Sequence, residues 1–455
     1  MAVPERTLGE LNLHMRQSLV ARIVQVPVQR FIRTQGVSSA FLLIAAVAAL
    51  VWANSPWHDS YYHAWHIQLA LSGLRLPVHA WINDAMMALF FFLMGMEIKQ
   101  EIVHGELSGD LRRAALPIFA GLGGMVAPAL IYTAFNHGLL SEHGWGVPMA
   151  TDIAFSLGVL AIIKDVPPEL KVFLLSLAIA DDIGAIVVIA FFYTDTLHWK
   201  YLLISGLLIA IILLCRKIGL GSQIIYASLG FGVWLAVLHS GVHATIAGIV
   251  LGLLMPVTSR VSLKEFSQLA SETAVEFREA QATGDIARAN RILGALEYLL
   301  QQTEAPADRV TRKLHDWIAF VVLPLFALAN AGVTFSAGMW RVLLHSPVAW
   351  GVAIGLLVGK PLGILAACWL TVKLRVSRLP SSVSWRQVAG IGVLAGIGFT
   401  VSLFIAGLAF EDQAHLDAAK AAVLFTSVVA GITGFALLRR IMPAQQPPAP
   451  SPPKG

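Results

Sequence analysis

Two adjacent aspartates, Asp181 and Asp182, lie in the middle of an apolar stretch that runs from Ser176 to Ala190. A carboxylate at the centre of a membrane-spanning helix costs about 2.5–3.5 kcal/mol, so the pair needs compensation. The two groups also couple, because the ionisation of one disfavours the ionisation of its neighbour. A small hard cation relieves this repulsion by taking oxygen ligands from both groups, after each has lost its proton. The pair therefore predicts a site at which metal ions and protons compete.

Two further ionisable residues, Asp152 and Lys360, lie inside other apolar segments. Ionisable residues within a membrane are rare and usually mark ion or proton pathways, although a network that only locks helices together is the alternative. Lys360 can pair with an aspartate or face the negative ends of half-helices. Apolar residues flank it on both sides, which disfavours a lysine that reaches out to the membrane surface.

A proline precedes Asp152 by four positions, in a short apolar span. Pro148 disfavours helix at the preceding residue, which indicates a helix interrupted inside the membrane. Thr151 then offers a hydroxyl group, and Asp152 can balance the positive N-terminal end of the following half-helix. A simple proline kink beside a cavity is the alternative.

Four glycines occur between Gly390 and Thr400, in the second half of the chain. By themselves they favour close helix packing over unwinding. Interrupted spans in corresponding positions of two halves, however, are typical of transporters built from inverted repeats, with the site where the two broken helices cross. The sequence therefore predicts repeats at 114–194 and 348–438.

A third group of titratable residues lies outside these breaks. Glu97 and Glu101 are four apart and share a helix face at the end of the second span. They suggest a proton-sensing entrance, and a solvated helix end is the alternative. His243 opens another span and titrates in the useful pH range, although a satisfied polar role is the simpler interpretation.

Composition places these residues in a membrane. The chain has 455 residues, of which 57% are hydrophobic and only 13% are charged. Globular domains carry about 25% charged residues, so the chain is predicted to be an all-α polytopic membrane protein. The net charge of +5 is spread over short loops and does not indicate nucleic acid binding. Cys215 and Cys368 have no metal-like spacing and indicate no disulfide framework.

Hydropathy predicts twelve spans, near 37–54, 80–98, 114–136, 147–163, 171–194, 200–215, 222–239, 242–256, 316–336, 348–372, 387–410 and 417–438. Lys and Arg concentrate in the N-terminal arm and in alternate loops. The intervening loops are assigned only Arg75, Lys200, Arg341 and Lys420. This asymmetry predicts that both termini are cytoplasmic, which requires an even number of spans.

The predicted organisation has five parts. They are a cytoplasmic arm at 1–36, spans one to eight at 37–256, a cytoplasmic helical insert at 257–313, spans nine to twelve at 314–440 and a disordered Pro-rich cytoplasmic tail at 441–455. In the insert, helical spacing covers 262–277 and 286–300, with an N-cap candidate at Asp285. Residues 66–78 alternate around Ser72-Gly73, which suggests a small external β-hairpin, with an irregular loop as the alternative.

Seven stretches together resemble the NhaA-type sodium/proton antiporters of bacterial inner membranes. They are WINDAMMALFFFLMGMEIKQE, ATDIAFSLGVLA, LAIADDIGAIVVIAFFYT, SGVHATIAG, LPLFALANAGV, GKPLGI and GIGFTVSLFIAGLAF, in order from residue 81 to residue 410. The resemblance implies a multi-pass protein of the bacterial inner membrane with two interrupted, crossing helices. It would exchange internal Na⁺ or Li⁺ for external protons by an electrogenic, pH-activated mechanism, without a cofactor.

The resemblance also implies roles for individual residues. Asp182 would be the most direct sodium ligand and Asp181 a proton carrier or the partner of Lys360, with Thr151 and Asp152 at the helix crossing. Glu97, Glu101 and His243 match positions associated with pH activation, and the hairpin at 66–78 matches a homodimer contact. Gln100 departs from the family pattern, which has a basic residue there, and the 257–313 insert is longer than in compact members.

Two other classes of protein use similar features. A sodium-coupled symporter of organic solutes can share a fold with crossed helices, because fold does not fix substrate. An intramembrane aspartyl protease also needs two buried aspartates, but on separate spans, and its Gly-x-Gly-Asp motif is absent from the sequence. We therefore expect no enzymatic activity.

Overall fold

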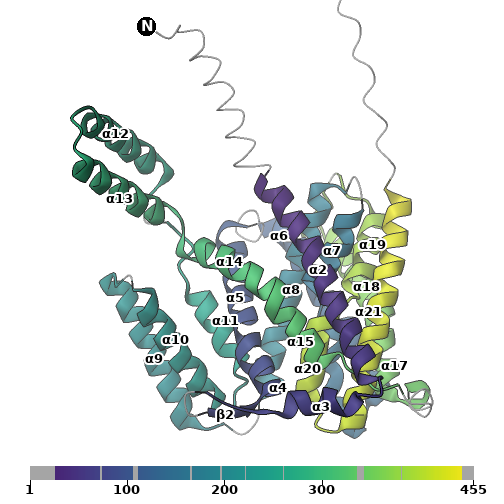
Figure 1. The fold of residues 1–455 in the computed structure, drawn as a ribbon. Coiled ribbons are helices and arrows are strands. Elements are labelled where there is room, and N and C mark those ends of the chain that lie inside the picture. The colour runs from purple at the N-terminus through teal and green to yellow at the C-terminus, as the bar shows by residue number, and fades with distance from the viewer. Residues whose placement is uncertain are drawn as a thin grey trace, which may run out of the picture. The chain divides into compact units, whose positions relative to one another are not determined.

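The structure, a computed structural model, describes residues 26–71, 74–105, 111–163, 166–194, 197–220, 222–259, 261–335, 343–380 and 382–442. The described part is helical apart from one two-stranded sheet (Figure 1). The chain divides into two compact units. Unit 1 comprises residues 1–68, 112–189 and 323–455, and unit 2 comprises residues 69–111 and 190–322.

Unit 1 carries the predicted aspartates and Lys360. Its helices are α2 (Val26–Ala53), α3 (His58–His66), α6 (Leu111–Asn136), the 3₁₀ helix η4 (Leu140–Met149), α7 (Ile153–Ile162), α8 (Pro168–Phe192), α15 (Leu323–Asn330), α17 (Pro347–Ile354), the π-helical segment η6 (Gly355–Gly359), α18 (Lys360–Lys373), α19 (Trp385–Ala395), α20 (Phe399–Ala409) and α21 (Gln413–Ile441).

Unit 2 contains the hairpin, the insert and the second predicted span. Its elements are β1 (Gln68–Leu71), β2 (Leu74–Pro77), α4 (Val78–Ala80), the π-helical segment η2 (Trp81–Met86), α5 (Met87–His104), α9 (Trp199–Ile218), α10 (Gln223–Leu238), α11 (Thr245–Leu254), α12 (Leu263–Ala282), α13 (Ile286–Thr303), α14 (Pro306–Trp317) and the π-helical segment η5 (Ile318–Val322).

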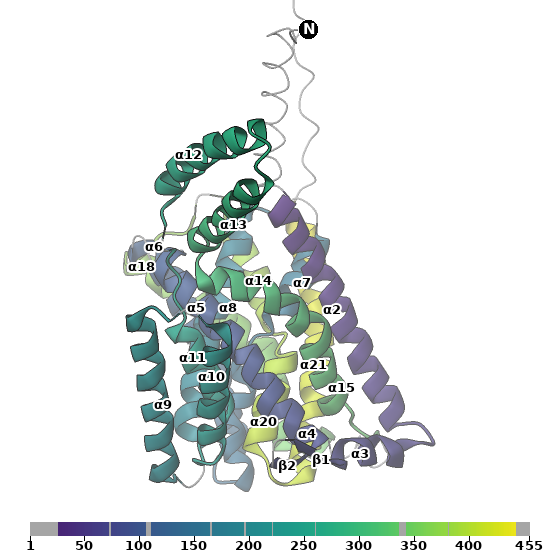
Figure 2. The same cartoon turned by 60° about the vertical axis from the view of Figure 1, so that its left-hand side comes forward.

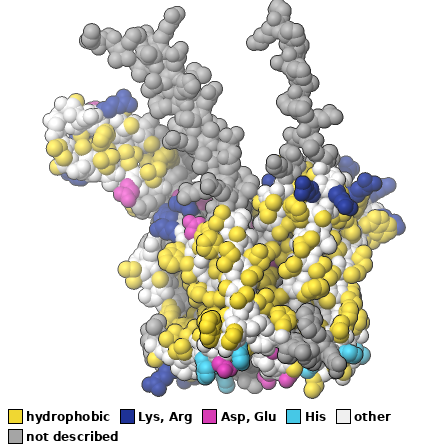
Figure 3. Space-filling model, turned by 45° about the vertical axis from the view of Figure 1, so that its right-hand side comes forward, with side chains coloured by type: hydrophobic (Ala, Val, Ile, Leu, Met, Phe, Trp, Pro, Cys, Tyr) yellow, Lys and Arg dark blue, Asp and Glu magenta, His cyan; other side chains and the backbone are white. Residues whose placement is uncertain are grey.

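Eight helices in the described residues are long and apolar enough to cross a membrane, and up to ten if each of two bent pairs forms one span. The two other predicted spans correspond to the shorter apolar helices α10 and α11. Large apolar side chains on α2 and α21 are exposed. Figure 3 shows hydrophobic side chains spread over much of the face in view. A multi-pass membrane protein is therefore confirmed, whereas the number twelve and the repeats remain predictions.

Both predicted interruptions are present in unit 1. η4 and α7 are bent by 40° around the extended residues 150–152, and α19 and α20 are bent by 46° around 396–398. At the first break, Pro148 cannot donate a backbone hydrogen bond. At the second, a Cβ on Gly396 would lie 2.6 Å from the carbonyl oxygen of Leu356, so the backbones approach too closely for a side chain. Unwinding and close packing thus occur together in the glycine-rich stretch.

The span that carries Lys360 also contains an irregularity. The π-helical segment η6 joins α17 to α18, which begins at Lys360 with Pro361 in its first turn. Proline inside a continuous helix removes one backbone hydrogen bond, and a π-helical turn accommodates the resulting change of register. α18 packs so closely on α6 that a Cβ on Gly363 would overlap the carbonyl oxygen of Gly123.

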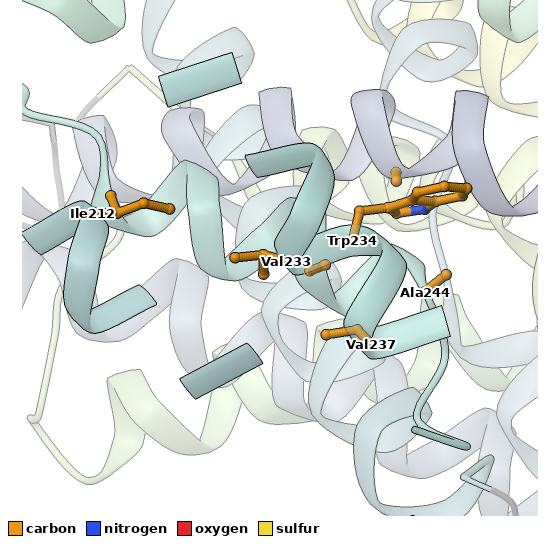
Figure 4. Close-up of a cluster of buried hydrophobic side chains, with 7 residues drawn as sticks. Ile212, Val233, Trp234, Val237 and Ala244 are labelled. Atoms are coloured by element: carbon orange, nitrogen blue, oxygen red, sulfur yellow. The ribbon is translucent and has the colours of Figure 1, made fainter. Parts of the chain in front are cut away.

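Unit 2 has its own apolar core. Figure 4 shows buried side chains from α9, α10 and the start of α11, among them Ile212, Val233, Trp234 and Ala244. The indole of Trp81 stacks on that of Trp234, with 6.2 Å between the ring centroids. α5 and α11 are in close backbone contact, since a Cβ on Gly252 would overlap the carbonyl oxygen of Phe92.

The two-stranded sheet fits the predicted hairpin, and the insert contains the helices α12 and α13. β1 and β2 pair as a two-stranded sheet, and the turn at Ser72-Gly73 lies outside the described residues. In the insert, α12 begins with a capping box between Ser262 and Glu265, and α13 begins after Asp285, which accepts a hydrogen bond from the N–H of Arg288. α12 and α13 pack against each other, as Figure 2 shows. Residues 1–25 of the predicted arm and 443–455 of the predicted tail lie outside the described residues.

Candidate functional site

Asp181 and Lys360 form an ion pair inside unit 1. The Nζ of Lys360 lies 2.6 Å from Oδ2 of Asp181, and both side chains are fully buried. Lys360 also donates a hydrogen bond to the carbonyl oxygen of Met149, the last residue of η4. A helix C-terminus carries partial negative charge, so the ammonium is compensated by the carboxylate and by a half-helix end. The structure thus brings together two residues that are 179 positions apart, 360 − 181.

Thr151 connects this ion pair to the second broken helix. Its Oγ1 lies 2.7 Å from Oδ2 of Asp181 and 3.1 Å from the carbonyl oxygen of Ala395, where α19 ends. A hydroxyl group has one proton, so the hydrogen bond is shared or alternates between these two acceptors. The site therefore contains a donor that can change partners without moving its backbone.

Asp152 caps both half-helices that begin at the crossing. Its Oδ1 accepts a hydrogen bond of 2.9 Å from the N–H of Phe155 in α7. Its Oδ2 accepts from the N–H of Thr400 at 3.1 Å and from the hydroxyl of Thr400 at 2.6 Å, in the first turn of α20. Helix N-termini stabilise negative charge, so two of them compensate one buried carboxylate. This confirms that Asp152 lies at an N-terminus and adds the second helix, which the sequence did not indicate.

Two serines join the broken helices in a mirrored pattern. Ser156, the fourth residue of α7, donates a hydrogen bond of 3.1 Å to the carbonyl oxygen of Leu394 in α19. Ser402, the fourth residue of α20, donates one of 2.7 Å to the carbonyl oxygen of Val147 in η4. Each bond ties the first turn of one half-helix to a carbonyl group beside the break in the other broken helix. The crossing is therefore a defined polar junction in an apolar surrounding.

Asp181 and Asp182 differ in their surroundings. Oδ1 of Asp181 is buried and has no hydrogen-bond partner among the described residues, although Oδ2 has two. Asp182 is only 6% exposed and lies close enough to Lys360 to interact electrostatically with it. An unsatisfied buried carboxylate oxygen is costly, and a cation that requires oxygen ligands would satisfy it. No group of three or more His, Cys, Asp or Glu side chains in the described residues could hold a resident metal ion.

The three residues of the predicted pH response lie in unit 2, and they are not all close together. Glu97 and Glu101 are near the C-terminal end of α5, as predicted. His243 precedes α11, and its Nδ1 lies 3.1 Å from Oγ1 of Thr245. α11 packs alongside α5 so that a Cβ on Gly248 would overlap the backbone of Ala88, nine residues before Glu97. Nine residues of helix span about 13 Å, so His243 lies near the opposite end of this helix pair.

Gln100, the departure from the family pattern, has a specific partner. Its Nε2 donates a hydrogen bond of 2.6 Å to Oδ1 of Asp308 in the first turn of α14. A basic residue at this position would form an ion pair with that carboxylate. The amide preserves the link between α5 and α14 without a second charge.

Three buried polar residues of unit 1 were not singled out from the sequence. Thr400 binds Asp152, and the hydroxyl of Ser427 accepts a hydrogen bond of 3.2 Å from the N–H of Phe399. A hydroxyl residue two positions after Gly398, at the start of the half-helix that follows the break, was a usable signal for Thr400. The assignment of Lys420 to a loop is wrong, because Lys420 lies within α21 and is 8% exposed. Its alanine-rich neighbours form buried helix instead of a loop.

The fold and the site define a class of protein. Multi-pass helical proteins in which broken helices cross beside buried ionisable residues are secondary transporters of small ions or solutes. The family model described as Na+/H+ antiporter 1 matches residues 29–438. This chain therefore belongs to that antiporter family.

Individual relatives agree with the family assignment. The chain is 42% identical over 422 residues to the Na(+)/H(+) antiporter NhaA 2 of Syntrophotalea carbinolica. The aligned residues cover 91% of this chain and 96% of the relative. It is 44% identical over 437 residues to the Na(+)/H(+) antiporter NhaA 2 of Sorangium cellulosum, and the aligned residues cover 93% of this chain and 92% of that relative. Among solved structures, the sodium proton antiporter MjNhaP1 of Methanocaldococcus jannaschii matches with a TM-score of 0.44 and 13% sequence identity. The match covers 95% of this chain and 97% of that chain.

Proposed function

We propose that this chain exports Na⁺, and also Li⁺, in exchange for external protons, with Asp181 and Asp182 as the carboxylates that alternate between cation and proton. The observation that carries the proposal is the buried Asp181–Lys360 ion pair, whose carboxylate retains one unpartnered oxygen beside Asp182. Family membership and the names of the relatives support sodium/proton antiport as the activity.

Competition at one carboxylate accounts for the coupling. Sodium that binds Asp182 and the free oxygen of Asp181 adds a positive charge next to the ammonium of Lys360. Two positive charges at one buried carboxylate are unfavourable, so sodium binding is coupled to proton loss from this cluster. If two protons leave for each cation, exchange moves net charge and responds to the membrane potential. Thr151 can supply a further oxygen ligand by turning its proton toward Ala395.

Alternating access then follows from the crossing. The half-helices meet through Asp152, Thr400 and the two serines, so the site is held at one point while the surrounding helices open to either face. We propose that the protein lies in the bacterial inner membrane with both termini cytoplasmic, and that twelve spans contain the inverted repeats 114–194 and 348–438. The basic residues of the alternate loops support this orientation.

We also propose pH activation and dimerisation as properties of unit 2. Glu97 and Glu101 lie at the end of α5 that is predicted to face the cytoplasm, where a change of internal pH would act. The hairpin of β1 and β2 is short and isolated, and two-stranded sheets of this kind are marginal in water unless another surface covers them. A second copy of the chain would provide that surface.

The experiment is dequenching of a ΔpH-sensitive dye in everted vesicles after addition of Na⁺, Li⁺ or K⁺, between pH 6.5 and 8.5. We expect Na⁺ and Li⁺ to cause dequenching with the wild type and not with Asp182→Asn. Asp59→Asn, which removes an exposed carboxylate of α3, is the matched control and should behave as the wild type. Absence of any sodium response, in vesicles shown to contain the protein, would refute the proposal and favour a sodium-coupled symporter.

A further inference from the structure

The unpartnered oxygen of Asp181 faces helix α6. Oδ1 of this carboxylate is buried and has no hydrogen-bond partner among the described residues, whereas Oδ2 has two. A Cβ added to Gly124 of α6 would lie 3.8 Å from Oδ1, which is an ordinary van der Waals contact. The backbone of α6 therefore passes beside this oxygen at a position that has no side chain.

Gly124 lies where α6 meets two other helices. The same added Cβ would lie 2.9 Å from Cγ1 of Ile364 in α18, and Asp181 belongs to α8. One turn earlier, α6 packs so closely on α8 that a Cβ on Gly121 would lie 2.9 Å from the Cβ of Ala180. Figure 2 shows α6 and α18 next to each other. Oδ1 is therefore adjacent to a junction of three helices.

α6 brings no hydrogen-bonding side chain to this junction. Residues 114–131 of α6 include no ionisable, hydroxyl or amide side chain. The charged groups around Asp181 are Lys360 of α18, at 2.6 Å, and the adjacent Asp182 of α8. Because the nearest part of α6 carries no donor, Oδ1 keeps the energetic cost of a buried oxygen without a partner.

A serine at position 124 would remove this cost. Its hydroxyl extends one bond beyond a Cβ that lies 3.8 Å from Oδ1, so the two oxygens can approach to about 2.5–3.0 Å. A buried carboxylate without a partner is also a stronger acceptor than a helix carbonyl that already has one. The choice of glycine at this position therefore decides whether Oδ1 is occupied by the protein itself.

We propose that Gly124 keeps Oδ1 of Asp181 free to bind a cation and thereby sets the sodium affinity of the site. This inference rests on the proposed sodium/proton antiport and adds a residue that determines affinity without binding the ion through a side chain. A cation that binds Oδ1 takes the place of a hydrogen-bond donor and satisfies the buried oxygen. Glycine supplies neither a donor nor a side chain at that place.

A hydroxyl at position 124 would oppose sodium and protons alike. A hydrogen bond to a carboxylate stabilises its charged form, and either ligand must replace that bond when it binds Oδ1. At alkaline pH, where protons compete little, the sodium KM should therefore rise by the full factor. At acid pH both ligands are weakened by the same factor, so the apparent sodium KM should return toward the value without the hydroxyl.

The test compares Gly124→Ser with Gly124→Ala by sodium-induced dequenching in everted vesicles between pH 6.5 and 8.5. Both variants add the same Cβ and the same overlap with Ile364, but only serine can donate a hydrogen bond. At pH 8.5 we expect the sodium KM of Gly124→Ser to exceed that of Gly124→Ala by about ten- to hundredfold. This difference should shrink as the pH falls toward 6.5.

Gly390→Ser is the matched control. The three nearest atoms to its added Cβ all belong to the side chain of Leu438 in α21, so the substitution also overlaps a flexible side chain. Its hydroxyl is not directed at α8. Its sodium KM should therefore remain that of the wild type at every pH.

Two kinetic results would overturn the proposal. One is an equal sodium KM for Gly124→Ser and Gly124→Ala. The other is a KM of Gly124→Ser that is raised by the same factor at every pH, which is the effect of a structural distortion. If Gly124→Ser does not fold, both substitutions are compared in an Ile364→Ala background, which removes the overlapping Cγ1.

Thermal denaturation in detergent gives a readout that does not depend on transport. Without sodium, Gly124→Ser should be more stable than Gly124→Ala, because its hydroxyl satisfies the buried oxygen. It should also gain less stability from sodium chloride, relative to choline chloride, than Gly124→Ala does. Wild-type vesicles without sodium exchange would refute the proposed function, whereas normal wild-type exchange with serine and alanine variants that behave alike would refute only the role of Gly124.

Discussion

The carboxylate of Asp152 accepts two hydrogen bonds from Thr400, one of 3.1 Å from the backbone N–H and one of 2.6 Å from the hydroxyl. Because the same carboxylate caps α7 through Phe155, one residue stabilises the start of both half-helices. The two broken helices are therefore energetically coupled at the crossing. A substitution that weakens the N-terminus of one half-helix at this junction therefore also changes the stability of the other half-helix.

Thr400→Val should reduce stability through this junction. The variant removes the hydroxyl donor to a buried carboxylate and keeps the shape of the side chain, which should cost about 1–3 kcal/mol of unfolding free energy. Thermal denaturation in detergent measures the loss. Thr426→Val is the matched control, since Thr426 is equally buried but donates only within its own helix, to Ala422 at 2.7 Å. Equal losses in the two variants would contradict a special role for Thr400.

The Asp181–Lys360 pair should show strong coupling in a double-mutant cycle. Lys360→Met leaves a buried carboxylate without its counter-charge, which should cost about 3–5 kcal/mol of unfolding free energy. Addition of Asp181→Asn removes that charge and should restore most of the loss, although transport remains absent. Denaturation of the two single variants and the double variant measures the coupling. A double variant that is less stable than Lys360→Met would show that the ion pair does not dominate this cluster.

Tyr61 connects α3 to the chain after α15, and its phenol should be visible in a pH titration. Its hydroxyl donates to the carbonyl oxygen of Leu328 at 2.9 Å and accepts from the N–H of Gly332 at 3.1 Å. Burial raises the pKa of Tyr61 to about 12. Because the folded state holds this proton more tightly than the unfolded chain, its stabilising effect is complete below about pH 10 and is lost as pH rises toward 12.

Tyr61→Phe tests both parts of this argument. The variant leaves the N–H of Gly332 without its partner, which should cost about 1–3 kcal/mol at neutral pH. It should also lack the component of alkaline destabilisation between about pH 10 and 12 that the wild type shows. Denaturation midpoints at a series of pH values measure both effects. Identical pH profiles would show that Tyr61 is not the group responsible.

Gly363→Ala should destabilise the contact between α6 and α18. An added Cβ would overlap the carbonyl oxygen of Gly123 and lie 2.7 Å from the Cβ of Ala127, so the helices must separate. Overpacking of this kind costs about 1–3 kcal/mol. Gly206→Ala in α9 is the control, because no described atom lies within 4 Å of its added Cβ. The control should be neutral or more stable by about 0.5–1 kcal/mol, and denaturation in detergent distinguishes the two variants.

The sequence by itself determined the class of structure and showed that three aspartates lie inside apolar segments. Low charge and long apolar runs indicate a membrane protein because uncompensated charges are expensive in lipid, and that cost is local to each segment. The helix breaks were also local: Pro148 and the glycines near 396 act on their own backbone, and both breaks occur where they were predicted. The N-caps at Asp152 and Asp285 follow from the same short-range chemistry.

The tertiary structure decided which groups meet. The distance of 2.6 Å between Lys360 and Asp181 joins α18 to α8, and the bonds between Thr400 and Asp152 join α20 to α7. Neither pair can be obtained from spacing, because helix packing and not chain distance brings them together. Lys420 is the clearest example: a lysine at the very start of the predicted span 417–438 suggests a loop, and only the packing of α21 shows that it is buried. The burial of a side chain depends on the helices that pack around it, and those helices lie elsewhere in the sequence.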